Sequence, residues 1–388
     1  MNNAHRIAAF AAGFDPASLT LADVAVAARS LLDTHAVAIA GWNELTSLRL
    51  RRYLAGAASA APGASLWGEQ GGQADAEQAA LANGVAAHVL DYDDVSSPMR
   101  GHPSVALWPA LVALGEQRGL PGARLASAYA VGFEIIVKLA RGMAQPHYAQ
   151  GWHSTSGLGT LGCAAACSHL LGLDAQATAH ALGIAVAQTA GTRQNFGSDT
   201  KSFQAGHANM AGLRAALLAE TGFTAGDAAV DGAGGFVDLY GGSSDLLDAH
   251  VDALGRAPLE LHASGIEVKK YPMCYAAHRA LDGLLDLRRE HGLALDDVAT
   301  VDVTCARGSL VPLIHSRPLT GLQGKFSMEY AVAAALADGA VQLATFEDAA
   351  VQRPALQAFF AQVRVAEAGD ALFPRWTALR LKLRDGRA

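Results

Sequence analysis

Near residue 260 the hydrophobic pattern of this 388-residue chain changes from helical to strand-like. Before that point apolar residues recur at helical spacing, as in LADVAVAARSLLDTHAVAIAG, which ends on Gly41, a typical helix stop. After it, TVDVTC (300–305) and LRLKLRDG (379–386) alternate with period two, as half-buried strands do. The sequence therefore predicts a mainly α protein, with a large all-helical domain over 1–262 and a smaller α+β domain over 263–388.

Further helices are expected at 75–90, 104–119, 125–143, 157–173, 177–191 and 205–222, and in the second domain near 276–291 and 326–338. The 157–173 segment is almost entirely small or apolar, which predicts a buried helix. Residues 266–272 read as extended. The turn signal Asp385–Gly386 follows an alternating strand, yet the chain stops at Ala388, so we expect either a truncated C-terminal end or an unpaired edge strand.

Composition limits the function classes. Hydrophobic residues make up 51% and charged residues 17% of the chain, which is typical of a compact folded protein. The formal charge of −7 argues against a nucleic-acid partner, and no stretch approaches 18 uncharged apolar residues, so no membrane span is expected. Four scattered cysteines without a CxxC pair favour a cytoplasmic location, and the N-terminus has no convincing signal peptide.

A first candidate site lies in HVLDYDDVSSPMRGHPS (88–104). Asp91, Asp93 and Asp94 precede His102 by about ten residues, and a helix end followed by a loop could bring one carboxylate against the imidazole. Such a pair can act as an oriented acid and base. The alternative is that the aspartates face solvent or cap a helix.

A second candidate is His153, just before the small-residue helix. Ser154, Thr155 and Ser156 could cap that helix, and its amide groups could then hold an anion. The alternative is a structural histidine.

A third candidate is Lys201, placed a few residues before a helix over 205–222 whose first turn holds His207. A lysine near the positive end of a helix dipole is unfavourable, and an anionic substrate would relieve it. The alternative is an exposed loop cation.

A fourth group, Lys269, Lys270, Cys274 and His278, falls at a strand-to-helix turn. The four-residue spacing of Cys274 and His278 could suit a metal, but zinc needs three or four ligands, so no metal is expected. The chain also has no P-loop, GxGxxG after a strand, GxSxG or HExxH motif, so no cofactor is expected. Aspartate, histidine and lysine without a cofactor motif suit proton transfer on an anion.

Five blocks in this order resemble the MmgE/PrpD family: LANGVAAHVLDYDD, GHPSVALWPALVALGE, TKSFQAGHANMAGLRAALLAETGFT, VKKYPMCYAAHRALDG and GKFSMEYAVAAALADG. The resemblance runs from about residue 20 to the end. It implies a helical domain joined to a smaller α+β lid, a homodimer, and no metal or organic cofactor.

The resemblance also implies catalytic roles for Asp91, His102, His153 and Lys201. It places Lys269 and Cys274 of the lid at the site, with His278 one turn later, and we expect these three residues and His207 to bind the substrate. Cys274 stands where the family's decarboxylases have a lid histidine. A thiol is not a ready proton donor, so decarboxylation is the less favoured reaction.

The family's reactions begin with loss of a proton next to a carboxylate. We therefore expect a dehydratase-like carbon–oxygen lyase acting on a small di- or tricarboxylate. An epimerase of an amino-dicarboxylate and a non-catalytic carboxylate-binding protein remain alternatives.

Overall fold

The structure, a computed structural model, describes residues 2–55, 63–369 and 375–388. The chain divides into two compact units. The helical unit comprises residues up to Val89 together with Asp93–Gln194 and Thr200–Val268, and the second unit comprises Leu90–Tyr92, Asn195–Asp199 and Lys269–Ala388. The predicted mainly α class is confirmed.

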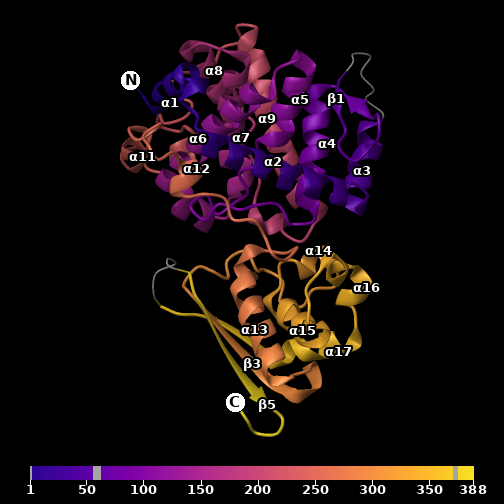
Figure 1. Ribbon diagram of the computed structural model, residues 1–388. Helices are drawn as coiled ribbons and strands as arrows, with labels where there is room; N and C mark the ends of the chain where they lie inside the picture. The colour runs from indigo at the N-terminus through magenta and orange to yellow at the C-terminus, as the bar shows by residue number, and fades with distance from the viewer. Residues whose placement is uncertain (1, 56–62, 370–374) are drawn as a thin grey trace. The chain divides into compact units, whose positions relative to one another are not determined.

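The helical unit is built from twelve described helices (Figure 1). They are α1 (Asn3–Gly13), α2 (Leu21–Gly41), α3 (Leu45–Leu54), α4 (Ala76–Val89), α5 (Trp108–Arg118), α6 (Gly122–Ala149), α7 (Ser154–Leu171), α8 (Ala175–Val186), α9 (Asp199–Glu220), α10 (Phe236–Leu239), α11 (Ser244–Val251) and α12 (Glu260–Ala263). A short ladder, β1 (Ala64–Ser65) paired antiparallel with β2 (Gln73–Ala74), departs from the expected all-helical domain. Two-residue strands are too short to leave an alternating pattern in the sequence.

Helix α7 occupies the core of this unit. Its residues are small or apolar and nearly all buried, and it packs against α1, α5, α6 and α8. An expectation about its start is wrong: the N-cap is His153, whose side chain makes no capping hydrogen bond, while Ser154 already belongs to the helix. The helix ends at Gly172, which adopts the left-handed conformation that glycine tolerates best.

Helices α4 and α9 approach closely because each has a glycine at the crossing. A Cβ on Gly84 would lie 2.8 Å from the Cα of Gly206, and one on Gly206 would lie 2.5 Å from the carbonyl oxygen of Leu81. Helix α9 also begins at Asp199, six residues earlier than expected. Lys201 is therefore in the first turn of α9 and not in a loop, and the glycine crossing brings that turn near the end of α4.

The second unit contains a three-stranded sheet in the order β4-β3-β5 (Figure 1). Its elements are α13 (His278–His291), β3 (Val298–Cys305), α14 (Gly321–Gly324), α15 (Met328–Asp338), α16 (Asp348–Val351), α17 (Pro354–Phe359), β4 (Val363–Glu367) and β5 (Thr377–Leu383). Central β3 pairs parallel with β4 and antiparallel with β5, with Val301 opposite both Val363 and Leu381. Helix α13 contacts β5, α15 contacts β4, and the two helices pack on each other.

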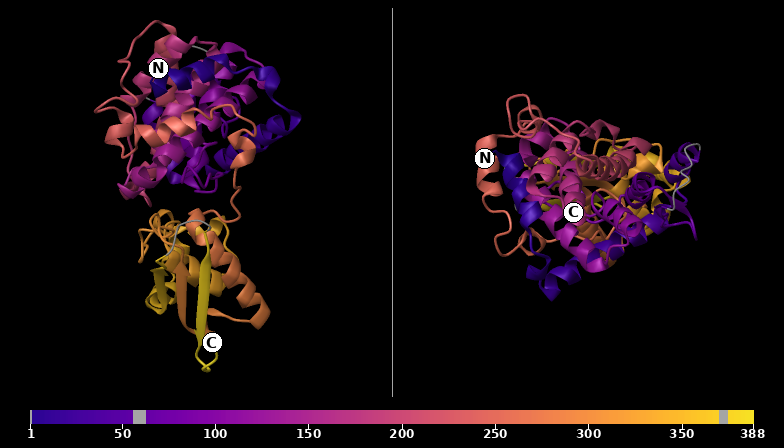
Figure 2. Two further views of the ribbon diagram at one scale, coloured as in Figure 1. Left: turned by 90° about the vertical axis from the view of Figure 1, so that its left-hand side faces the viewer. Right: turned by 90° about the horizontal axis from the view of Figure 1, so that it is seen from above.

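The two alternating segments form β3 and β5, whereas β4 was not predicted. The expected extended stretch near 266–272 contributes a single bridge, between Glu267 and Val95. Strand β5 is an edge of the sheet, and the described chain turns back after it through a bond from the Leu383 amide to the Arg387 carbonyl (Figure 2).

Candidate active site

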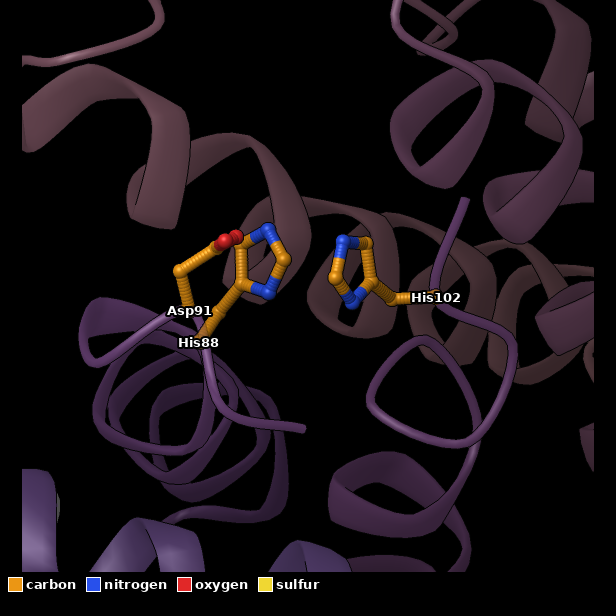
Figure 3. Close-up of side chains that lie close together, drawn as sticks. All are labelled: His88, Asp91 and His102. Atoms are coloured by element: carbon orange, nitrogen blue, oxygen red, sulfur yellow. The ribbon is translucent and has the colours of Figure 1, made fainter. Parts of the chain in front are cut away.

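Polar side chains from four segments of the helical unit meet in its interior. They are His88 from the last turn of α4, Asp93 and His102 from the loop between α4 and α5, His153 before α7, and Lys201 and Gln204 from α9. We call these six residues the histidine cluster. The ring of His88 lies edge-on to that of His102 with 4.6 Å between centroids, and it stacks on His153 at 6.0 Å. Figure 3 shows His88 and His102, and also Asp91, three residues after His88 in the chain.

Asp93 joins two of the histidines. Its Oδ2 lies 2.8 Å from Nδ1 of His88 and 3.1 Å from Nδ1 of His102. The Asp93 side chain is fully buried, and burial alone would raise its pKa. Electrostatic interactions and hydrogen bonds with His102 and His88 outweigh burial and hold the pKa of this carboxyl well below its ordinary value. Asp93 is therefore an anion, which accepts the Nδ1–H of His88 and lies within ion-pair distance of Nδ1 of His102.

His88 also links Asp93 to Lys201. Nζ of Lys201 lies 2.6 Å from Nε2 of His88, and only 4% of Lys201 is exposed. Burial lowers the pKa of His88 to about 4, so its ring is neutral at pH 7. With Nδ1–H donating to Asp93, Nε2 carries the lone pair and accepts a hydrogen bond from Lys201. The neutral imidazole thus lies between an ammonium and a carboxylate.

The tautomer of His153 follows from Gln204. The Gln204 amide nitrogen donates to the carbonyl oxygen of Thr192 at 3.2 Å, which turns the amide oxygen toward His153. His153 Nδ1 donates to that oxygen at 2.6 Å, so its Nε2 carries a lone pair. Burial, followed by the nearby charge of Lys201, lowers the pKa of His153 well below its ordinary value. His153 is consequently a neutral imidazole that can accept a proton at Nε2.

The loop that carries His102 is fixed on both sides of the histidine. The His102 amide donates to Oγ1 of Thr155 at 3.1 Å. Two residues later the hydroxyl of Ser104 donates to Oδ2 of Asp94 and lies 2.8 Å from the Tyr129 hydroxyl. Burial raises the pKa of Asp94 well above its ordinary value. Among His88, Asp93 and His102, His102 has the most exposed side chain, at 11%, so it is the one nearest to solvent.

A separate polar group belongs to the second unit. Nζ of Lys269 donates to both the carbonyl oxygen and Oδ2 of Asp91, at 2.7 and 2.9 Å. Asp91 has φ of 49°, a left-handed conformation that costs about 1 kcal/mol in a residue other than glycine. Nζ of Lys325 donates to the carbonyl oxygens of Leu90 and Pro272, each at 2.8 Å.

The remaining sequence candidates lie outside the histidine cluster. His278 Nε2 donates to the Met273 carbonyl at 3.2 Å, and burial lowers the pKa of His278 to about 4. Cys274 packs with Phe196 and Phe326 in the second unit. On α9, the ring of His207 stacks on Phe203 and its Nε2 bonds the Gln188 carbonyl.

The carboxylate that meets His102 is that of Asp93, whereas Asp91 engages Lys269. His102, His153 and Lys201 do come together. The sequence reasoning missed His88 and Gln204, and it did not identify Asp93 as the residue that joins His88 to His102. A sequence signal did exist for His88, because a histidine in the last turn of a helix lies only five residues before Asp93.

The same residues bear on metal binding. His88, Asp91 and His102 are side chains of the kinds that bind zinc. However, both ring nitrogens of His88 are engaged, one by Asp93 and the other by Lys201. A metal at Nε2 would have to displace an ammonium. The arrangement fits proton transfer and anion binding better than metal coordination.

Comparisons with known proteins agree with this architecture. A model of the MmgE/PrpD N-terminal domain matches residues 5–247, and one of the MmgE/PrpD C-terminal domain matches residues 271–381. The chain is 28% identical to cis-aconitate decarboxylase of Homo sapiens over 319 residues, which cover 79% of this chain and 65% of the relative. It is 29% identical to cis-aconitate decarboxylase of Mus musculus over 79% of this chain and 64% of the relative, and 26% identical to that of Aspergillus terreus strain NIH 2624 / FGSC A1156 over 70% and 59%. The chain thus spans about two thirds or less of the length of these relatives.

Proposed function

Because the chain belongs to the MmgE/PrpD family, we propose that it is a cofactor-independent lyase that removes a proton next to a carboxylate of a small di- or tricarboxylate. The observation that carries the proposal is the histidine cluster itself. Neutral imidazoles and a lysine ammonium meet in an interior where Asp93 is almost fully shielded from water. Such groups can take up a proton and stabilise an anion in the same place.

His153 is the proposed base. Gln204 fixes its Nδ1–H, so the lone pair on Nε2 has a defined direction. A base held neutral by burial is ready at neutral pH, whereas an imidazolium would first have to lose a proton. His102, which lies beside Asp93 and is the more exposed of the two histidines near it, is the proposed acid: its Nε2–H bond breaks as that proton passes to the leaving hydroxyl, which departs as water. The proton taken from carbon stays on His153, and exchange with solvent then restores both rings.

Lys201 is the proposed electrostatic group. Removal of the carbon-bound proton places negative charge on the adjacent carboxylate oxygens, and an ammonium fixed beforehand stabilises that charge without reorganisation. His88 orients the ammonium through the contact between its Nε2 and Nζ of Lys201. The Lys201 ammonium acts as a point charge, which suits a delocalised enolate.

The departing group decides the reaction class. Departure of hydroxide, with its proton, gives a dehydratase, which is the outcome we propose. Decarboxylation is the second candidate, because the similar curated proteins are named cis-aconitate decarboxylases. Cys274 argues against it, since it packs among aromatic rings at the position that the family resemblance gives to a lid histidine.

The test is a set of incubations in D2O followed by proton NMR. Substrates are hydroxy-tricarboxylates, cis-aconitate and amino-dicarboxylates. New alkene signals from a hydroxy acid support the dehydratase, and loss of a carboxylate from cis-aconitate supports the decarboxylase. Deuterium exchange without net conversion indicates an epimerase instead. No change in any substrate, with tight binding to one of them, would leave a carboxylate-binding protein and overturn the proposal.

We also propose that two copies of the chain associate through α2. The exposed face of α2 is apolar, with Leu21 90%, Leu32 70% and Ile39 50% exposed. By length and composition α2 is the one described helix that would also suit a membrane span. Burial of its apolar stripe against a second copy removes it from water, and the family resemblance supports a homodimer.

A further inference from the structure

We propose that Lys269 and Lys325 form a clamp on residues 90–92 that sets the positions of His88 and Asp93. Lys269 is then a positioning residue and not a ligand of the substrate. Only the turnover test of this inference depends on the proposed function. It starts from the division of the chain: Leu90–Tyr92 groups with the second unit, whereas the residues just before and after it group with the helical unit.

Chain connectivity makes this short segment decisive. His88 lies two residues before Leu90, and Asp93 directly follows Tyr92. A residue spans at most about 3.6 Å, so the segment cannot shift without displacing one or both of the side chains that share a hydrogen bond in the histidine cluster.

The segment is held at each of its three residues. Lys325 binds the carbonyl oxygen of Leu90 and ties it to Pro272, while its ammonium lies 4.4 Å from the centre of the Phe346 ring. Lys269 binds Asp91 twice, and the Tyr92 hydroxyl donates to the Lys270 carbonyl at 3.3 Å. Both clamp lysines are only 4% exposed.

The backbone conformation of Asp91 explains why the clamp is needed. The chain bends at Asp91, between His88 and Asp93, where φ is 49°, a conformation that side-chain-bearing residues rarely adopt. Lys269 closes a ring by binding the carbonyl oxygen and the carboxylate of this same residue, which fixes backbone and side chain together. The Lys269 side chain is 0% exposed and its charge is paired with that of Asp91. The geometry therefore suits positioning better than substrate binding.

Three variants test the clamp by turnover: Lys269→Met, the double variant Asp91→Gly/Lys269→Met, and Lys270→Met as the control at the exposed neighbouring lysine. We expect Lys269→Met to lower kcat by about 100-fold with little change in KM, as displacement of reacting groups by about 1 Å does. The double variant should recover to within about 10-fold of the parent, because glycine adopts positive φ unaided and no carboxylate is left unpaired. A raised KM with kcat preserved, or no recovery in the double variant, overturns the clamp.

A second readout does not depend on turnover. NMR titration of His88, assigned with His88→Gln, should show a ring that stays neutral to about pH 4 in the parent. In Lys269→Met the midpoint should move toward 6.5, the ordinary value, and it should return in the double variant. An unchanged His88 titration in folded Lys269→Met overturns the clamp, whether or not any substrate is turned over. If Lys269→Met does not fold, Lys325→Met takes its place with the same two readouts.

Discussion

Replacement of Lys201 by methionine tests both the structural contact of this lysine and its proposed role toward the substrate. Methionine has a similar length, so it fills the buried site without opening a cavity. It removes the donor to Nε2 of His88 and the charge proposed to face the substrate. Lys201 is 4% exposed and bonded within the protein, so the alternative of an exposed loop cation does not hold.

The magnitudes follow from these contacts. The loss of one preorganised donor at an anion site lowers kcat by about 100- to 1,000-fold, or about 3–4 kcal/mol. The unsatisfied acceptor on buried His88 costs about 1–3 kcal/mol of the free energy of unfolding. Removal of a buried ammonium offsets part of that cost, because an ion is unfavourable in the interior. We therefore expect a large loss of turnover and a small fall in melting temperature.

The assay measures kcat, KM and Tm for Lys201→Met and Lys201→Arg beside the parent. Lys382→Met on exposed β5 is the control and should match the parent in all three. Lys201→Arg should not restore kcat, since a planar guanidinium cannot replace a compact ammonium. Near-parental turnover in a folded Lys201→Met variant would refute the electrostatic role.

Three further outcomes are expected. Gln204→Leu should lower kcat more than it raises KM, measured by steady-state kinetics, because the Nδ1–H of His153 loses its acceptor and the base its fixed tautomer. The folded-state pKa of His88 is about 4 against 6.5 unfolded, so at His88 the unfolded chain binds more protons between these values. The contribution of His88 to the free energy of unfolding should therefore fall by about 3 kcal/mol from pH 7 to pH 4, and urea titrations should show a weaker pH dependence for His88→Gln than for the parent. Leu32→Arg on α2 should give monomers in sedimentation velocity at concentrations where the parent is dimeric.

Elements with a long repeat could be predicted from the sequence, and short or irregular ones could not. Helix α2 ends at the predicted Gly41, and β3 and β5 follow the alternating segments. The five-residue strand β4 is too short for its pattern to distinguish it from a loop. The start of α9 was misjudged because the polar run before residue 205 resembles a turn, while its glycine crossing with α4 is a tertiary contact.

The candidate site, too, could be predicted from the sequence only in part. Residue types suggested acid–base chemistry, and His102, His153 and Lys201 do converge. Three aspartates within four residues left open which one would meet His102, because the choice depends on the backbone turn at Asp91. Local sequence does not determine that turn, since asparagine, aspartate and glycine all adopt positive φ and only the partner groups select among them.

Burial gives the histidine cluster its chemistry. An exposed histidine is partly protonated near neutral pH, whereas burial keeps His88 and His153 neutral. Burial would also tend to neutralise Asp93, but its interactions with His102 and His88 keep it ionised. That anion balances the Lys201 ammonium across His88. In the proposed function, a fixed ammonium beside neutral imidazoles lets the cluster both hold a carboxylate and remove the neighbouring proton.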